Sequence, residues 1–485
     1  MSNIIHFNDI SKNNYSLSAK LYENREVKYE NSAKLSEFLI CPIQKGSEVG
    51  SAAYIHDKKF QFIRTANIHK NNLLFDEKSA VGIPEKFFEN HDLKMNQILI
   101  VKDGSLGNVA FLDKDYPRFM LSSGINALSC KHPLYVFSIL QHDLFKKNFE
   151  YNVASGSTIS HAKDIYLNFD IPLPKNNDEN IIKFIENIMK SIILKERLIK
   201  EKINSLNDFI SSLLNFNNFD NIKNIYPTYS DLVSIKRLDS GYYSKKSIYI
   251  RNLIESYENG YFLLNPQDLK GGNTPKIRSE PSQDNLEYKW IIPSYISEFG
   301  LNIEPCSINF KGKNNLNKNA CLIINRTSKK LDGQSGKYVG ISSFYDYSLF
   351  GKGHHNQGFY RIENYDDIDL ITFIVLLNHP IYREYFGEIS IGSKMKEIKK
   401  YNLIEIPFPK FNIEIKQKIK NMYYNKQGWD FLNSKTDSFE EYDKIWSEKA
   451  GIFDLYIMLN KQKNVLDNCV EQLYENKNIE INYMF

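Results

Sequence analysis

The residues with the clearest chemical potential are basic and hydroxyl side chains placed where apolar, strand-like runs end. Arg64, Lys102 and Arg326 each follow such a run, where a turn would project them outward. Arginine and lysine pair with phosphates or guanine edges, while small hydroxyls and glycine amides permit close backbone approach. This chemistry is typical of a nucleic-acid-binding surface, although each residue alone is also typical of a solvated loop. The neighbouring candidates are Ser157, Thr158, Thr327, Ser328, Lys329, Lys330, Ser393 and Lys394.

Motifs of catalytic chemistry are missing or incomplete. Gly333–Lys337 lacks the spacing and hydroxyl of a phosphate-binding loop, and Asp103–Gly107 lacks the spacing of a nucleophile elbow. The pair His354-His355 has no nearby acid or cysteine to complete a metal site, so we expect it in a solvated loop. Glu414 and Lys416 have the E-x-K spacing of nuclease sites, but no aspartate on a strand precedes them. The sequence therefore predicts a non-catalytic chain without a metal or cofactor of its own.

The elements that must position the candidate residues are organised as an internal duplication. Ala154–Ile159 is echoed by Ser390–Met395, and the Gly-Ser pairs in the two segments lie 236 positions apart. Each segment is followed by an apolar-Pro-apolar-Pro tetrad, at Ile171–Pro174 and at Ile406–Pro409. A period of this length is far too long for a solenoid, so it indicates two copies of one domain-sized unit.

Strand-like runs match between the two copies as well. Ile98–Val101 resembles Cys321–Ile324, since both are β-rich and both precede a polar turn. Phe62–Thr65 likewise parallels Lys289–Ile292. Basic candidates thus recur at matching places of both copies, and this recurrence favours a binding surface over unrelated solvated loops.

Helical periodicity follows each tetrad. From Asn180 to Leu213, apolar residues recur every three or four positions and form a stripe on one helix face. About 34 residues at ~1.5 Å rise would make a rod of roughly 50 Å. A second helical region begins at Ile413 and resumes over Ile452–Leu473, with an interruption over Tyr424–Lys449. A stripe this long needs a partner helix, so we predict two long helices paired antiparallel in coiled-coil fashion.

Composition sets the broad class. The chain has 485 residues, and its 62 Lys and Arg against 58 Asp and Glu give a net charge of +4, too mild to prove or exclude a nucleic-acid partner. With 42% hydrophobic and 25% charged residues, it is expected to be globular. Its five cysteines never stand at C-x-x-C spacing, and no run approaches the ~20 apolar residues of a membrane span. We therefore expect a soluble cytoplasmic protein.

The predicted fold is α+β, with two β-rich domains separated by two long antiparallel helices in an elongated, pseudo-twofold arrangement. The predicted boundaries are 1–174 for the first domain, 175–217 for the first helix, 218–409 for the second domain and 410–485 for the second helical region, interrupted near 425–450.

These features together resemble the specificity (S) subunit of type I restriction-modification enzymes. Gly271–Pro275 is similar to the G-x-T-P opening of a target recognition domain, and Tyr288–Ile291 is similar to the strand that follows it. Ile98–Gly107 is similar to a strand-turn segment through which the family reads DNA, and Ile324–Ser328 stands at that place in the second copy. The resemblance covers roughly residues 35 to 480, and it departs from the family pattern where the second helical region is interrupted.

The resemblance implies a DNA-reading subunit. Each recognition domain would read one short half-site of double-stranded DNA, and the helices would fix the gap between the half-sites. The helices would also dock methyltransferase (M) subunits, two per chain, which carry S-adenosylmethionine and the methylation chemistry. In some assemblies a motor-nuclease (R) subunit would join.

The set of candidate residues is completed as follows. The predicted DNA contacts also include Ser105, Thr274 and Lys396, and the docking of M subunits is predicted on the apolar helix residues Ile188, Ile192, Ile199, Leu455 and Leu459. Two alternatives stay open at this point. One is a stand-alone defence nuclease that uses Glu414, Lys416 and an unrecognised acid, and the other is a structural adaptor that holds proteins without binding DNA.

Overall fold

The computed structural model describes residues 31–70, 72–152, 161–220, 222, 226–235, 239–274, 288–301, 307–308, 315–327, 330–331, 334–335, 338–392, 395–430 and 438–479. The chain divides into two compact units. Unit 1 comprises Met1–Leu194, Asp430–Asp443 and Lys461–Phe485, and unit 2 comprises Lys195–Trp429 and Lys444–Asn460. Six predicted DNA contacts lie outside the described residues: Ser157, Thr158, Ser328, Lys329, Ser393 and Lys394.

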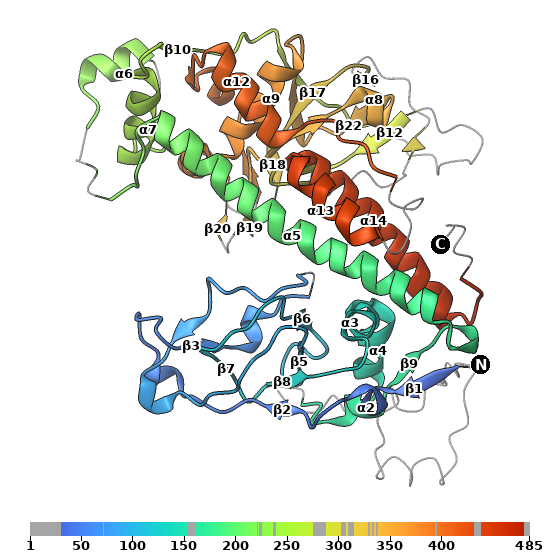
Figure 1. Ribbon diagram of the computed structural model, residues 1–485. Helices are drawn as coiled ribbons and strands as arrows, with labels where there is room; N and C mark the ends of the chain where they lie inside the picture. Colours follow the sequence, from blue (N-terminus) through green and yellow to red (C-terminus); the bar gives the residue numbers. More distant parts are fainter. Residues whose placement is uncertain are drawn as a thin grey trace, which may run out of the picture. The chain divides into compact units, whose positions relative to one another are not determined.

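Unit 1 is built on two small sheets (Figure 1). One has the strand order β2 (Gln44–Lys45), β8 (Ile125–Leu128), β5 (Ile98–Val101) and β6 (Val109–Phe111). The other has the order β4 (Val81–Gly82), β3 (Gln61–Ile63) and β7 (Phe119–Leu121), and β3 pairs with β7 in parallel. A two-stranded ladder joins β1 (Ser32–Lys34) to β9 (Asp170–Pro172). The helices are α2 (Leu35–Phe38), α3 (Pro133–Gln141) and α4 (Asp143–Asn152), with short 3₁₀ turns at Ser51–Ala53, Thr65–Asn67, Glu85–Phe87, Ile165–Asn168 and Lys175–Asn177.

Unit 2 repeats this plan. Its first sheet has the order β11 (Leu269–Gly271), β23 (Phe359–Ile362), β17 (Ala320–Ile324) and β21 (Ser342–Tyr345). Its second has the order β15 (Ser307–Ile308), β12 (Tyr288–Ile291), β22 (Gly353–His355) and β16 (Asn315–Leu316), and β12 pairs with β22 in parallel. Shorter ladders join β10 (Tyr261–Phe262) to β25 (Phe408–Pro409), β13 (Ile296–Ser297) to β14 (Gly300–Leu301), β18 (Arg326–Thr327) to β24 (Lys396–Glu397), and β19 (Lys330–Leu331) to β20 (Gln334–Ser335).

The helices of unit 2 lie before, between and after these strands in the sequence. They are α6 (Tyr229–Ile235), α7 (Lys245–Glu255), α8 (Tyr347–Phe350), α9 (Asp367–Asn378), α10 (Pro380–Ile389), α11 (Lys400–Ile404) and α12 (Ile413–Tyr423), with a 3₁₀ turn at Pro293–Tyr295. Helix α9 is buried from Leu370 to Asn378, and α12 packs against it. The apolar runs read from the sequence thus form the strands and helices of one continuous core.

The two units therefore share a strand order, which confirms the α+β class and the internal duplication. Both Pro tetrads are held by a buried tyrosine. Tyr135 donates to the Pro172 carbonyl at 2.6 Å, and Tyr382 donates to the Pro407 carbonyl at 2.8 Å.

The sequence comparison of β3 with β12 is wrong by one residue. Ser122 donates its backbone N–H to Ile63 and Asn356 donates to Ile291, so Ile63 is equivalent to Ile291.

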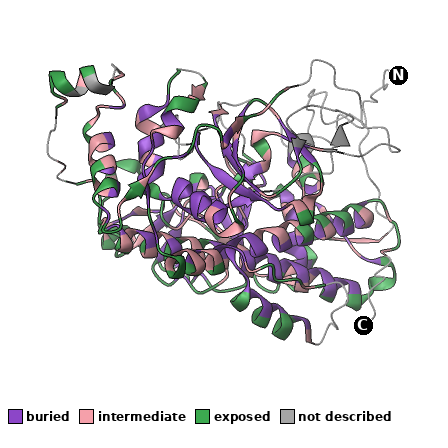
Figure 2. Cartoon of the chain, turned by 90° about the horizontal axis from the view of Figure 1, so that it is seen from above, coloured by how far each residue is buried: buried purple, intermediate pink, exposed green. Residues whose placement is uncertain are grey.

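Helix α5 (Glu179–Leu213) is as long as its apolar stripe predicts, and it lies beside α13 (Phe439–Lys449) and α14 (Ile452–Tyr474) (Figure 1). In unit 1, the Ser191 hydroxyl and the Gln462 side-chain amide are hydrogen-bonded, joining the first part of α5 to the last part of α14. In unit 2, the Lys202 ammonium group on α5 donates hydrogen bonds to the Glu448 and Ala450 carbonyls at the end of α13. Figure 2 shows these helices buried on one side and exposed on the other.

The interruption of the second helical region contains a helix of its own, which corrects the expectation of a break from 425 to 450. Helix α13 fills residues 439–449, so only 424–438 separates it from α12. The buried Lys195 amine lies 5.4 Å from the ring centroids of both Trp429 and Trp446. A cation between two indole faces is attracted to both, so α5 helps to fix α13 in place.

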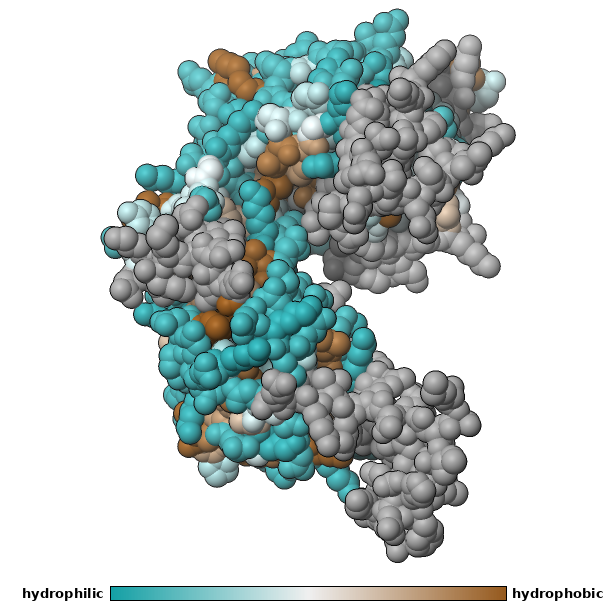
Figure 3. Space-filling model, turned by 90° about the vertical axis from the view of Figure 1, so that its right-hand side faces the viewer, coloured by the Kyte–Doolittle hydropathy of each residue, from teal (hydrophilic) through white to brown (hydrophobic). Residues whose placement is uncertain are grey.

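The face of the chain shown in Figure 3 is mainly hydrophilic among the described residues, with small separate hydrophobic areas. Within the described ranges, none of the helices has the length and apolar character needed to span a lipid bilayer.

Candidate nucleic-acid interface

In unit 1, the turn after β5 carries two of the predicted DNA contacts. Gly104 and Gly107 both adopt positive φ, and the Gly107 N–H closes the turn onto the Val101 carbonyl at 3.0 Å. Lys102 is half-buried at the start of the turn and Ser105 is exposed at its tip. The Lys102 N–H donates to Gly124 at 2.9 Å, and the Lys102 carbonyl accepts from Ala162 at 2.8 Å. The turn is therefore held by backbone bonds on both sides.

Unit 2 has the same hydrogen bonds at the end of β17. The Asn325 N–H donates to Gly358 at 2.9 Å, and the Asn325 carbonyl accepts from Ile398 at 2.8 Å. The Gly340 N–H donates to the Ile324 carbonyl at 2.7 Å, as Gly107 does to Val101 in unit 1. Lys102 is thus equivalent to Asn325. We call this arrangement the strand-end ladder: residues 102–103 with 161–162 in unit 1, and 325–326 with 397–398 in unit 2.

The two glycines that close the turns show the same packing. A Cβ on Gly107 would lie 2.8 Å from the Phe149 ring, and a Cβ on Gly340 would collide with the Phe386 ring. Both glycines have positive φ, +74° and +88°. A side chain is therefore disfavoured at each position for two reasons: the backbone has positive φ, and the neighbouring phenylalanine ring occupies the space that a Cβ would need.

The strand-end ladder of unit 2 brings three predicted DNA contacts together. Arg326 pairs with Glu397, and Thr327 pairs with Lys396, along β18 and β24. Arg326, Thr327 and Lys396 are all half-buried. Lys330 lies further along the same connection, on β19. Guanidinium, hydroxyl and ammonium donors on one short ribbon suit phosphate oxygens and base edges.

Arg64 is placed differently from the sequence expectation. Its guanidinium lies 5.7 Å from the Tyr54 ring and donates to the Ser79 carbonyl at 3.3 Å, so part of its bonding capacity is used within unit 1. With Ile63 equivalent to Ile291, the residue of unit 2 that corresponds to Arg64 is the apolar Ile292. Arg64 is therefore not a basic position repeated in both units.

Thr274 is anchored by the turn after β22. Its hydroxyl accepts from the Gln357 N–H at 3.4 Å, and the carbonyl of the preceding Asn273 lies 3.0 Å from His354 Nε2. The expectation that His354-His355 lies in a solvated loop is wrong, because both side chains are fully buried on β22. His354 stacks on Trp290, with centroids 5.5 Å apart.

A buried ionic network explains how His355 is accommodated. Arg361 Nη1 lies 3.3 Å from His355 Nε2, and Arg361 Nε donates to Glu363 at 3.0 Å. Lys270 also pairs with Glu363. Burial, with the positive charge of Arg361, lowers the pKa of His355 to about 3, so its imidazole is neutral at physiological pH.

The apolar helix residues predicted to dock partner subunits are interior. Ile188, Ile192 and Leu455 are 0% exposed, Ile199 is 4% and Leu459 is 5%. The expectation that these five side chains form an exposed docking face is wrong, because the helices bury them within the chain's own packing.

One cluster in unit 1 has the residue types of a hydrolase triad. Ser47 donates to Glu89 and its hydroxyl lies 3.3 Å from His91 Nε2. His91 Nδ1, however, accepts the Leu121 N–H at 3.1 Å, so the neutral ring carries its proton on Nε2. Burial lowers the pKa of His91, which favours this neutral form. Nε2 is therefore a donor and cannot take the Ser47 proton, as a catalytic base must.

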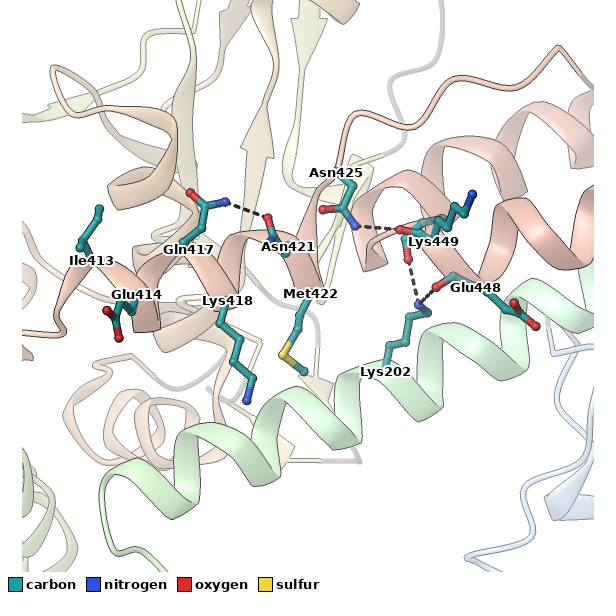
Figure 4. A pocket seen from close by; sticks show the side chains of 11 residues that line it. Lys202, Ile413, Glu414, Gln417, Lys418, Asn421, Met422, Asn425, Glu448 and Lys449 are labelled. Carbon is teal, nitrogen blue, oxygen red and sulfur yellow. Dashed lines mark hydrogen bonds between the residues drawn. The ribbon is translucent and has the colours of Figure 1, made fainter.

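The proposed nuclease residues do not converge either. On α12, Glu414 and Lys416 stand two positions apart and therefore do not share a helix face. Lys416 forms an ion pair with Asp369 at 2.7 Å, whereas Glu414 lines a different feature, an open groove of about 640 Å³ between α12, α5 and the end of α13 (Figure 4). Across the ranges described above, no group of three or more His, Cys, Asp or Glu could hold a metal ion.

Comparison with known proteins finds one matching family and several similar solved structures. Residues 32–205 match the family described as type I restriction modification DNA specificity domain. A search of curated proteins finds no match. The chain is similar to the S subunit of a type I restriction-modification system from M. genitalium, with 13% identity, 94% of this chain and 98% of that chain covered, and a TM-score of 0.41.

Two other solved structures are similar over comparable lengths. The HsdS subunit from Thermoanaerobacter tengcongensis has 11% identity, with 92% of this chain and 96% of that chain covered, and a TM-score of 0.26. A chain from a study of complex assembly and conformational transition of the type I R-M system has 12% identity, 92% and 97% coverage, and a TM-score of 0.28. The family match ends within α5, so the assignment of unit 2 depends on its repetition of unit 1.

Proposed function

We propose that this chain, whose residues 32–205 match the family described as type I restriction modification DNA specificity domain, is the DNA specificity subunit of a restriction-modification complex. The observation that carries the proposal beyond unit 1 is the strand-end ladder. The same backbone hydrogen bonds recur around Lys102 in unit 1 and around Asn325 in unit 2. Two copies of one reading element suit a bipartite site, in which each unit reads one short half-site of double-stranded DNA.

The chemistry of modification belongs to partner subunits in this proposal. Methyltransferase subunits, two per chain, would carry S-adenosylmethionine and transfer the methyl group, and a motor-nuclease subunit would join where DNA is also cut. The histidine tautomer at the Ser47 cluster and the divergence of Glu414 from Lys416 support a chain that reads DNA without catalysing a reaction.

Docking of these partners would use the outer faces of the helices. The inward stripe of α5 is already buried, and its exposed positions are polar, as at Lys200 and Glu201. We therefore propose a polar contact surface in place of the apolar residues first expected.

The experiment that tests the function is methylome sequencing of the host with and without the gene. Loss of one motif made of two short blocks separated by a fixed gap is the expected result. A methylome that does not change, together with a chain–methyltransferase complex that shows no preference among DNA sequences in a mobility-shift assay, would contradict it. Metal-dependent DNA cleavage by the chain alone, abolished by Glu414→Ala, would instead establish the nuclease alternative.

A further inference from the structure

The two units differ in charge at the strand-end ladder that they share. In the backbone pairing of the ladder, Asp103 lies opposite His161 in unit 1, and at the equivalent positions Arg326 lies opposite Glu397 in unit 2. His161 and Glu397 are 236 positions apart, the same period as the Gly-Ser pairs. In unit 1 the acidic residue, Asp103, follows the central strand β5 and the basic residue, His161, lies on the partner segment of the ladder. In unit 2 the basic residue, Arg326, follows the central strand β17 and the acidic residue, Glu397, lies on the partner segment.

His161 is fixed in orientation while remaining accessible. Its Nδ1 lies 2.7 Å from Asp103 Oδ1, and the imidazole side chain is 57% exposed. A carboxylate accepts only, so Nδ1 carries the proton of this bond, and in the neutral ring Nε2 is left as an acceptor. Within the described part of the chain, Asp103 is the only side-chain hydrogen-bond partner of His161.

The Asp103 side chain is held in place by packing against Gly124 and Thr65. A Cβ on Gly124 would lie 2.9 Å from Thr65 Cγ2 and 3.3 Å from Asp103 Cβ, so both side chains pack onto this glycine. The backbone next to the pair is fixed by the hydrogen bond that the Ala162 N–H donates to the Lys102 carbonyl. An exposed ion pair alone contributes little to stability. This pair lies beside Lys102 and the turn that carries Ser105, both predicted DNA contacts. We therefore assign the pair to DNA binding and not to stabilisation of the fold.

Arg326 offers the opposite hydrogen-bonding character at the equivalent edge. Its guanidinium makes no side-chain hydrogen bond to any residue that the structure describes. In the major groove, a guanidinium donates to guanine O6 and N7, whereas an acceptor such as imidazole Nε2 suits the amino groups of adenine or cytosine. The two units thus present a donor and an acceptor at the same place in their folds.

We propose that His161 determines base specificity in the half-site read by unit 1, that Asp103 is its positioning residue, and that Arg326 determines base specificity in the half-site read by unit 2. This inference rests on the proposed DNA-reading function. Sequence reasoning selected Arg326 but missed His161, because the ladder that aligns them is formed by segments distant in the chain.

The test is methylome sequencing of cells that carry the whole system with the wild-type chain, His161→Gln or Arg326→Ala. Each variant is expected to relax the motif at a base in one half and to leave the other half intact, and the two variants are expected to affect different halves. Lys163→Ala, an exposed lysine two residues beyond His161, is the matched control and should keep the motif unchanged.

Binding by the purified complex gives the second readout. The preference for the native duplex over one altered in the first half-site is expected to fall about tenfold in His161→Gln, as one hydrogen bond of discrimination is lost. Asp103→Ala should produce much of the same loss, and Asp103→Asn should restore preference because its amide oxygen still accepts from Nδ1. Should His161→Gln fail to assemble, His161→Asn, which can still donate to Asp103, replaces it.

The outcomes separate the two proposals. A wild-type system without any bipartite motif would overturn the proposed function itself. A bipartite wild-type motif that stays identical in His161→Gln and Arg326→Ala would overturn only this inference. A variant that loses all methylation is judged by its binding preference, and an unchanged preference between the two duplexes counts against the inference.

Discussion

Lys202 and Ala450 are joined by a 2.9 Å hydrogen bond in which Lys202 Nζ donates to the Ala450 carbonyl. The same ammonium group donates to the Glu448 carbonyl at 3.2 Å (Figure 4). The last carbonyls of a helix have no partner within the helix, and a cation there also opposes the negative end of the helix dipole. A side chain of α5 thus caps α13, the helix that occupies the interruption in the second helical region.

Replacing Lys202 by methionine should therefore destabilise unit 2. Methionine keeps most of the apolar stem but leaves two carbonyls without their donor, at a cost of about 1–2 kcal/mol in the free energy of unfolding. Urea unfolding of the purified chain measures the change. Lys200→Met, at an exposed position on the same helix, should shift the free energy by less than about 0.5 kcal/mol. Equal effects of the two substitutions would show that Lys202 does not act as a cap.

The turn glycines give a second prediction. Gly107→Ala and Gly340→Ala should each cost about 2–4 kcal/mol, because alanine is strained at positive φ and its Cβ meets the ring of Phe149 or Phe386. Thermal unfolding of the two variants measures the loss. Gly50→Ala is the control, since Gly50 has φ of −63° and open space around it. A neutral Gly340→Ala beside a costly Gly107→Ala would contradict the equivalence of the two turns.

The repeated parts of the fold could be predicted from the sequence because their signals are local. Apolar runs such as Ile98–Val101 form strands, and the three-to-four spacing of isoleucines makes α5. Helix α13 also carried a readable pattern, since Phe439 and Trp446 are both buried and stand seven positions apart. The polar, glycine-containing stretch before it concealed this pattern.

Other features depend on contacts between distant segments. His355 is buried because Arg361, on β23 of the other sheet, forms an ion pair beside it with Glu363, the residue directly after β23. The docking role of residues such as Ile188 was misassigned because an apolar stripe does not say whether its partner is another subunit or the same chain. Lys102 and Arg326 could be predicted as DNA contacts from the sequence, and this prediction is still to be tested. The proposal for His161 required the strand-end ladder, which joins segments distant in the chain.

The buried His379 should make the stability of unit 2 depend on pH. Its Nδ1 accepts from the Ile381 N–H at 3.3 Å, and Nε2 lies 3.1 Å from the Asn207 carbonyl on α5. Burial lowers the pKa of His379 to about 4. The unfolded chain then takes up this proton at higher pH than the folded chain, so the contribution is complete above about pH 6.5 and is lost as pH falls toward 4.

The measurement compares wild type with His379→Gln in urea at pH 7.5 and pH 4.5. The wild-type free energy of unfolding should fall by about 2–3 kcal/mol more than that of the variant between these two values. His56→Gln, at an exposed histidine, should follow the wild-type pH dependence. A variant with the same pH dependence as wild type would show that His379 is not held neutral.

Lys102 and Lys396 should contribute to DNA affinity without contributing to sequence preference. Each lies at a strand-end ladder, and neither forms an ion pair within the described chain. A lysine that neutralises one phosphate releases about one counterion. Lys102→Ala and Lys396→Ala should therefore weaken binding of the assembled complex to all DNA sequences to a similar extent.

The salt dependence of binding identifies this role. Titrations at several salt concentrations, on specific and non-specific duplexes, should show the slope of log affinity against log salt become shallower by about 0.9 for each substitution. Lys410→Ala, an exposed lysine directly after the second Pro tetrad, should leave the slope unchanged. A change in preference between the two duplexes with no change in slope would instead assign these lysines to base edges, because a base contact adds discrimination without releasing a phosphate counterion.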